Sequence, residues 1–189
     1  MNDSWYEVVT GSRLEQADII SSCPVLRPDV YDFPLPTDID LRSDTHNLLV
    51  LTQSCDLEND KIDEVLLAAV LDYAELTTNE SHRNPLVRSK KWRQAVARGD
   101  LPAYALIPPW ANTPIIGWSL IDFHHLFTLP KKYLESYAGS LDSRLRIVSP
   151  YKEHIAQSFA RYVMRVGLPS PLSDFETAEP GVRQEGRHR

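Results

Sequence analysis

Residues 48–71 read LLVLTQSCDLENDKIDEVLLAAVL, and this stretch decides the fold. It holds two apolar runs, 48–51 and 65–71, with a polar connection between them. Short runs rich in Leu and Val are typical of strands that are buried on both faces. We therefore predict two buried strands. The loop between them begins at Thr52 and carries hydroxyl, amide, thiol and carboxylate groups in the manner of a functional loop on a rigid scaffold.

Further strands are predicted on both sides of this pair. Residues 13–26 contain apolar positions and Cys23-Pro24, a pattern typical of an edge or opening strand because proline cannot donate to a central ladder. Segments 104–107 and 115–121 are apolar and bounded by prolines. Prolines and aspartates predict a long loop over 27–44. The predicted fold class is α+β, mainly β, with about five strands.

Two helices complete the prediction. Residues 87–97 are good helix formers with apolar positions along one side, which indicates a short basic helix. Near the end, large apolar residues recur at helical spacing until Gly167, so we expect a C-terminal helix that packs on the sheet. The residues of this apolar stripe are Ile155, Phe159, Tyr162, Val163 and Val166.

The length of 189 residues fits one domain with a tail. We predict a single domain over 1–170, with an insertion at about 72–105 that contains the basic helix. Residues 171–189 are rich in Pro, Gly, Glu and Arg and poor in large apolar groups, a composition that predicts disorder because it cannot offset its own ordering entropy.

Composition excludes several classes of protein. The longest apolar runs are far too short to span a membrane, and the first residues lack the basic and apolar regions of a secretory signal. Cys23 and Cys55 are too few for a disulfide scaffold and lack zinc-finger spacing, so we expect reduced thiols, no metal, no cofactor and a cytoplasmic location. The carboxylates between Asp56 and Glu64 do not match a calcium-loop motif and predict a solvated acidic loop.

Charge is distributed unevenly along the chain. The formal net charge is −6, but residues 83–98 hold six basic side chains and no acidic one. All other residues together therefore carry −12, six units more negative than the whole chain. Cations beside a tryptophan suit phosphate contact combined with base stacking. We expect this segment to bind nucleic acid or an acidic partner through Arg88, Lys90, Lys91, Trp92, Arg93 and Arg98.

The order of segments is similar to that of the MazF/PemK toxin family. The similarity runs from Asp18-Ile19-Ile20, through strands 48–52 and 65–70, to closing strands 116–122 and 127–130 and a terminal helix. The resemblance implies a small SH3-like barrel. It also implies a bacterial toxin–antitoxin-like or phage-defence-like role, with RNA or a protein as partner, and it leaves a homodimer open.

The catalytic pair of that family is missing. Its endoribonuclease members place an arginine just before the second strand and a threonine or serine just after the third. The matching positions here are His46-Asn47 and Leu71-Asp72. The first hypothesis is therefore a divergent barrel that binds RNA or protein as a regulatory component. The alternative is a metal-independent endoribonuclease with relocated catalytic residues, His46, Ser54 and Asp56, because a histidine works as an acid or base near neutral pH.

Two further expectations concern thiol and imidazole groups. Cys55 is predicted to pack as a small buried hydrophobe and not to act as a nucleophile, because neither a glycine-framed turn nor an adjacent base accompanies it. His124 and His125 follow a strand, and on extended backbone adjacent side chains point to opposite faces. We therefore expect one packed ring and one solvated ring.

Overall fold

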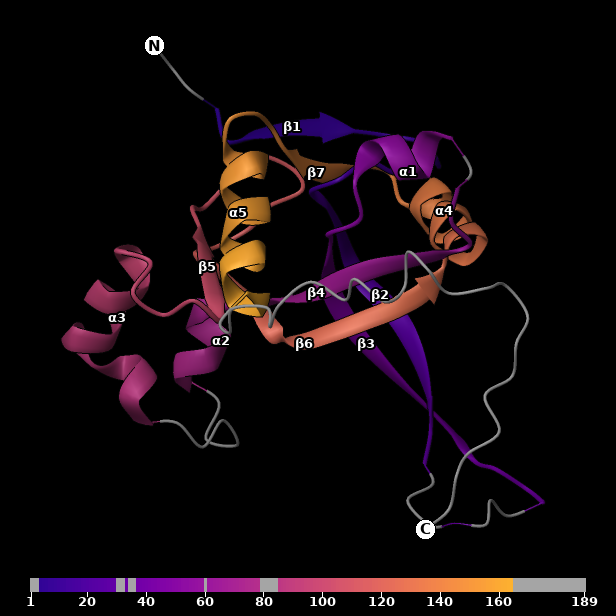
Figure 1. Ribbon diagram of the computed structural model, residues 1–189, viewed down its shortest axis with the longest axis horizontal. Helices are drawn as coiled ribbons and strands as arrows, with labels where there is room; N and C mark the ends of the chain where they lie inside the picture. The colour runs from indigo at the N-terminus through magenta and orange to yellow at the C-terminus, as the bar shows by residue number, and fades with distance from the viewer. Residues whose placement is uncertain (1–3, 30–32, 34–36, 60, 79–84, 165–189) are drawn as a thin grey trace, which may run out of the picture.

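The computed structural model describes residues 4–164 except 30–32, 34–36, 60 and 79–84 (Figure 1). The strands are β1 (Tyr6–Val9), β2 (Asp18–Pro28), β3 (Leu41–Val50), β4 (Glu64–Asp72), β5 (Tyr104–Ile107), β6 (Ser119–Pro130) and β7 (Arg144–Ile147). The helices are α1 (Ser54–Glu58), α2 (Tyr73–Thr78), the 3-10 helix η1 (Pro85–Arg88), α3 (Lys90–Ala97), α4 (Lys131–Ser140) and α5 (Tyr151–Val163).

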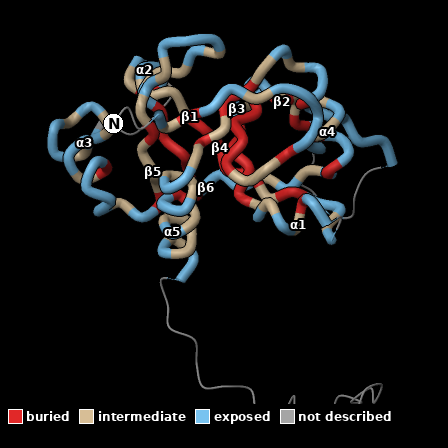
Figure 2. The backbone as a smooth tube through the Cα atoms, turned by 90° about the horizontal axis from the view of Figure 1, so that it is seen from above, coloured by how far each residue is buried: buried red, intermediate tan, exposed pale blue. Residues whose placement is uncertain are grey.

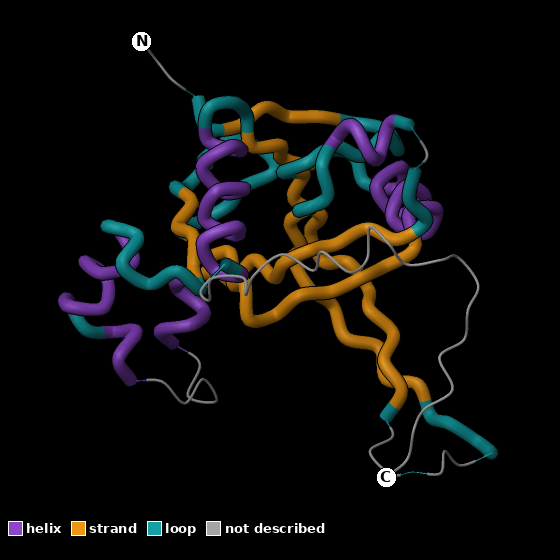
Figure 3. The backbone as a smooth tube through the Cα atoms, viewed as in Figure 1, coloured by secondary structure: helices purple, strands orange, loops and turns teal. Residues whose placement is uncertain are grey.

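The strands form one antiparallel sheet with the order β1-β7-β2-β3-β4-β6-β5. The α+β, mainly β, class is therefore confirmed. A closed SH3-like barrel is not: the sheet has seven strands rather than about five, and it is open, with β1 and β5 as its edges. Figure 3 shows these strands as a curved layer with helices around it.

Side chains, not strand pairing, connect the two edges of the sheet. The Tyr6 hydroxyl on β1 donates to the Pro108 carbonyl just after β5, at 2.6 Å. Its ring meets Trp110 edge-on at 6.0 Å between centroids. Helix α5 lies beside β5, and its Tyr151 stacks on Trp5 at 3.9 Å. Aromatic contacts and α5 therefore cover the opening that a barrel would close with hydrogen bonds.

Core residues occupy both faces of the sheet, because successive strand residues point to opposite sides. On β3, Leu49 faces a cluster that includes Ile121, Phe123 and Ile155 of α5. Its neighbour Leu48 faces a second cluster, which includes residues of α1 and α4. Figure 2 shows buried backbone in the central strands and exposed backbone in the surrounding helices and turns.

Two parts project from this core, one on each side (Figure 1). One is the far end of the β2–β3 hairpin, which pairs residues 23–28 with 41–46 beyond an irregularity at Ile20/Cys23. The other consists of α2, η1 and α3, where Leu76 and Val96 pack on Leu120 of β6. The second part lies within the predicted insertion at about 72–105. The first corrects the predicted loop over 27–44, since β2 ends at Pro28 and β3 begins at Leu41.

The C-terminal helix forms as predicted, with a narrower buried stripe. Ile155 is buried, Phe159 and Tyr162 pack on Phe123 at 5.4 and 5.9 Å between centroids, and Val163 is 57% exposed. Val166 and the tail 171–189 lie outside the described residues. Among the described helices, none combines the length and hydropathy needed to cross a membrane.

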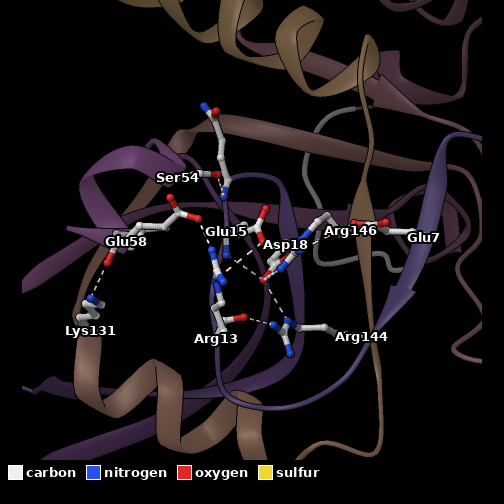
Figure 4. A network of polar contacts seen from close by, with 11 residues as sticks. Glu7, Arg13, Glu15, Asp18, Ser54, Glu58, Lys131, Arg144 and Arg146 are labelled. Carbon is white, nitrogen blue, oxygen red and sulfur yellow. Dashed lines mark hydrogen bonds and ion pairs between the residues drawn. The ribbon is translucent and has the colours of Figure 1, made fainter. Parts of the chain in front are cut away.

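An ion-pair network joins β7 to the start of β2 (Figure 4). Asp18 at the start of β2 and Arg144 of β7 are fully buried and meet at 3.0 Å. Arg146 binds the other oxygen of Asp18 and also meets Glu15 at 2.9 Å. Arg144 in turn donates to the carbonyl of Gly11, at 2.6 Å, and to that of Arg13. The Asp18 carboxylate thus binds β7 through Arg144 and Arg146, and Arg144 in turn holds the connection from β1 to β2.

We expect Arg144→Met to lower the free energy of unfolding by about 3–5 kcal/mol, because it leaves a buried carboxylate short of a partner. Arg42→Met is the matched control, since Arg42 pairs with Asp44 at 3.1 Å on the exposed hairpin and such pairs contribute at most about 1 kcal/mol. Urea denaturation followed by circular dichroism measures both values. Equal losses in the two variants would contradict a central role for the network.

Candidate functional site

A cleft of about 460 Å³ lies where the hairpin, the sheet and the α2-η1-α3 part meet. We call it the central cleft. Polar and aromatic groups from separate elements gather in it over an apolar floor. Its lining residues are Arg27, His46, Ala69, Leu71, Leu76, Val87, Trp92, Tyr104, Leu120, Asp122, His125 and Phe127.

A wide bulge in β6 shapes one wall of this cleft. Ala69 of β4 pairs with Asp122 of β6, but the preceding residue Ala68 pairs with Leu126. Three residues of β6, 123–125, therefore lie between the partners of two adjacent β4 residues. A bulge bends its strand and redirects side chains. Here Phe123 turns into the core beside α5, and the two histidines after it leave the regular alternation.

Both histidines bind the same carboxylate as a result. Asp122 is nearly buried, with a side chain only 4% exposed. Its Oδ1 accepts from the backbone N–H of His124 at 2.9 Å and lies 3.1 Å from Nδ1 of that ring. Its Oδ2 lies 2.7 Å from Nδ1 of His125. Alternation along an extended strand did not predict that both rings reach one carboxylate, because the bulge breaks that extended backbone.

The two rings nevertheless occupy different places. His124 packs edge-on against Tyr104 and Tyr162, at 5.6 Å between centroids in each case, and does not line the central cleft. His125 lines the cleft with a side chain that is 68% exposed. The two residues differ in access to the cleft while sharing one hydrogen-bond partner.

His46 enters the cleft from β3, where it pairs with Cys23 of β2. Its ring lies 4.9 Å from that of Phe127, and its Nε2 is buried without a hydrogen-bond partner among the described residues. Burial lowers the pKa of His46, and the nearby positive charges of Arg27 and His125 lower it further, against an opposing effect of Asp44. The neutral ring is therefore favoured.

Arginine and aromatic groups line the rest of the cleft. The Arg27 guanidinium sits over the Phe127 ring, 4.9 Å from its centroid, a geometry that fixes a cation beside an aromatic face. On the opposite wall, Trp92 stacks on Tyr73 at 6.3 Å and meets Tyr104 edge-on at 5.9 Å. The cleft thus combines one arginine with several aromatic rings.

Residues of the basic segment lie beside this aromatic wall. The side chains of Arg88 on η1, of Lys90, Lys91 and Arg93 on α3, and of Arg98 just after α3 are exposed, whereas Trp92 is partly buried. In the described part of the chain, Arg98 pairs with Asp100 at 2.9 Å, whereas Lys90, Lys91 and Arg93 form no ion pair. The segment therefore presents free cations to solvent and places its tryptophan in the cleft wall.

Ser54 and Asp56 lie elsewhere, on α1. The Ser54 hydroxyl accepts from the backbone N–H of Gln16 at 3.0 Å, within the network of Figure 4. Asp56 lies 4.0 Å from Lys61, and neither residue lines the central cleft. Of the three catalytic residues predicted from sequence, the structure therefore places only His46 in the cleft.

The cysteines do not meet at a common site. Cys23 is buried, and burial raises its pKa despite a hydrogen bond with Tyr133. Cys55 is exposed, so the prediction that it packs as a buried hydrophobe is wrong: α1 lies on the surface and only Leu57 of that helix is buried. No group of three metal-ligating side chains is found among the described residues.

Several lining residues escaped the sequence analysis, above all Arg27, Tyr104, Asp122 and Phe127. Asp122 had a signal, because a carboxylate inside the apolar run 119–123 must be paired if it is buried, and two imidazoles follow it directly. No sequence signal pointed to Arg27 and Phe127, because their proximity depends on a hairpin that the sequence did not reveal.

No known protein family matches this sequence, and a search of curated proteins finds none similar to it. The likeness to MazF/PemK toxins accordingly stays an interpretation of segment order.

The depressed pKa of His46 predicts a pH-dependent stability. The unfolded chain, with an ordinary histidine, takes up a proton at higher pH than the folded chain. His46 therefore contributes stability that is present above about pH 6.5 and is lost as the pH falls through its folded value. We expect His46→Gln to lose less stability than wild type between pH 7.5 and 5, as measured by urea denaturation.

The control for this prediction is His154→Gln, at an exposed histidine of α5. Parallel stability curves for wild type and His46→Gln would contradict the assignment.

Proposed function

We propose that this chain binds single-stranded RNA in the central cleft, as a regulatory component of a bacterial toxin–antitoxin-like or phage-defence-like system. The context comes from the resemblance to MazF/PemK toxins. Binding is supported by one observation, the meeting of Arg27, two imidazoles and three aromatic rings from four strands and α3 in a single cleft.

The chemistry of the cleft fits single-stranded RNA. Its volume lies within the range of about 300–1,000 Å³ that is usual for ligand sites. Unstacked RNA bases are recognised by stacking on aromatic side chains, while cations follow the phosphates. Tyr104 offers such a ring, and Arg27, which lies over the Phe127 ring, offers a cation for a phosphate.

Electrostatics directs a polyanion to the same place. The chain as a whole is acidic, so RNA is repelled from most of its surface. The free cations of α3 form the exception, and α3 carries one wall of the cleft through Trp92. His46 and Leu71, the positions that match the catalytic pair of the MazF/PemK family, also line the cleft.

A protein partner is the second candidate. Trp118 and Ile115 are 51% and 77% exposed. Trp118 also borders an apolar pocket of about 270 Å³ on the other side of Trp92. Large exposed apolar groups beside an apolar pocket are typical of protein interaction sites. Loss of a partner on Trp118→Ala with RNA binding intact would identify this surface as a separate one.

We expect reversal of Lys90, Lys91 and Arg93 to glutamate to weaken RNA binding by more than about tenfold at moderate salt. Each phosphate contact that is lost should also remove about 0.7 from the slope of log K against log salt for a single strand. The measurement is fluorescence anisotropy with labelled 20-nucleotide RNAs of mixed sequence at several salt concentrations.

The control variant reverses Lys61, Lys132 and Lys152, which gives the same change in net charge away from the cleft. If both triple variants weaken binding equally, only the net charge acts and α3 is not the contact. If wild type binds no RNA at any salt concentration, the proposed function is wrong.

A further inference from the structure

We propose that the central cleft is also a catalytic site for metal-independent cleavage of single-stranded RNA, with His46 and His125 as the acid–base pair and Asp122 as the positioning residue. The inference rests on the proposed function, because it requires RNA in the cleft. It replaces Ser54 and Asp56 of the sequence-based hypothesis with residues that the fold brings to His46.

Two imidazoles from different strands line the same cleft, on either side of a strand that carries a small residue there. His46 comes from β3 and His125 from β6, and β4 runs between these strands. Ala69 of β4 pairs with Leu48 on one side and with Asp122 on the other. Its methyl group leaves room above the sheet, and the cleft occupies this space. Both rings line it.

Asp122 determines which nitrogen of His125 faces the cleft. Its Oδ2 accepts the Nδ1 proton at 2.7 Å, so Nε2 points away from the carboxylate. The backbone N–H of His124 holds the other carboxylate oxygen at 2.9 Å, and burial keeps water from competing. A buried carboxylate that fixes the tautomer and orientation of an imidazole is a common device of acid–base sites.

His46 has the properties of the base. Burial and the charges of Arg27 and His125 favour its neutral ring, which can accept a proton near neutral pH. Its Nε2 is buried, whereas Nδ1 is not and has no hydrogen-bond partner among the described residues. Nδ1 is therefore the nitrogen that a substrate hydroxyl can reach. His125, whose Nε2 is directed outward from Asp122, then supplies the acid.

The reaction needs no additional reactant. Nδ1 of His46 takes the proton of a ribose 2′-hydroxyl, and the 2′-oxygen forms a bond to the adjacent phosphorus. The bond from phosphorus to the 5′-oxygen breaks, and Nε2 of His125 gives that oxygen a proton. The products are a 2′,3′-cyclic phosphate and a 5′-hydroxyl. Arg27, held on the Phe127 ring at the cleft, neutralises charge that develops on the phosphate.

Histidine substitutions test the assignment with a matched control. His125→Ala and His46→Ala should lower the cleavage rate by about 10²–10⁴-fold, which is the usual contribution of acid–base groups. His154→Ala should cleave within a few-fold of wild type, because His154 is an exposed histidine of α5 that neither contacts Asp122 nor lines the cleft. The substrates are total cellular RNA and a labelled mixed-sequence 20-mer in EDTA, and a 2′-deoxy 20-mer should stay intact.

Asp122→Asn distinguishes positioning from a structural role. It should lower kcat with little change in KM, while near-native circular dichroism is retained. One base and one acid give a bell-shaped dependence of kcat/KM on pH, and the substitution should change the shape of that curve. Other charged or titratable groups also influence this pH dependence. Arg27 of β2 and Asp44 of β3 affect the pKa of His46, and Asp122 affects that of Tyr104 on β5. Added imidazole should restore part of the activity of His125→Ala, because that ring is exposed.

Failure of the inference is distinguishable from failure of the proposed function. If wild type binds the 20-mer but no product with a 5′-hydroxyl or a cyclic phosphate is detected, the cleft binds RNA without cleaving it and the inference is wrong. Equal activity of wild type and His125→Ala overturns it as well. Absence of RNA binding, measured by anisotropy on the same preparation, rejects both proposals together.

Discussion

The buried ion pair between Asp18 and Arg144 holds β2 and β7 together inside the sheet. Strand β7, near the C-terminal end of the described chain, lies between β1 and β2. Asp18, fully buried, accepts from the nearby Glu15 N–H, but its charge is paired only when Arg144 and Arg146 lie beside it. Breaking a buried pair exposes an uncompensated charge, so the network selects one register of β7 against β2. That register fixes β2, and pairing through β3 and β4 then positions His46 relative to β6.

Apolar pattern predicted β4 and β5. They occur where the runs 65–71 and 104–107 indicated, because a short apolar run bounded by polar or proline-containing segments suits a strand of a packed sheet. β1 and β7 were missed for the opposite reason: they have four residues each, and β7 reads RLRI. Arginine at alternate positions predicts a solvated face, yet Arg144 is 1% exposed. Only a partner distant in sequence makes that burial favourable, and no local pattern reports it.

The site was predictable in part for a related reason. His46 followed from chain order and from the chemistry of imidazole, and the basic segment followed from charge. Their partners depend on two departures from regular structure, the long β2–β3 hairpin that carries Arg27 and the bulge that carries His125. A bulge of three residues has no periodic signal. It reverses the facing of every side chain after it, so alternation along β6 could not place His124 and His125 on one carboxylate.

Local conflicts with folding rules are informative because stable sequences avoid them unless another need retains them. The central cleft collects several: a buried ring nitrogen of His46 without a partner, a carboxylate drawn into an apolar strand, and a wide break in the β6 ladder. Trp110 also has an unsatisfied buried nitrogen, but it lies beside Tyr6 at the sheet edges, where no titratable acid–base pair accompanies it. An indole donor without a partner costs stability alone. In the cleft, the same conflicts accompany groups that can take or give a proton, the imidazoles of His46 and His125. This is the physical reason for proposing the activity there.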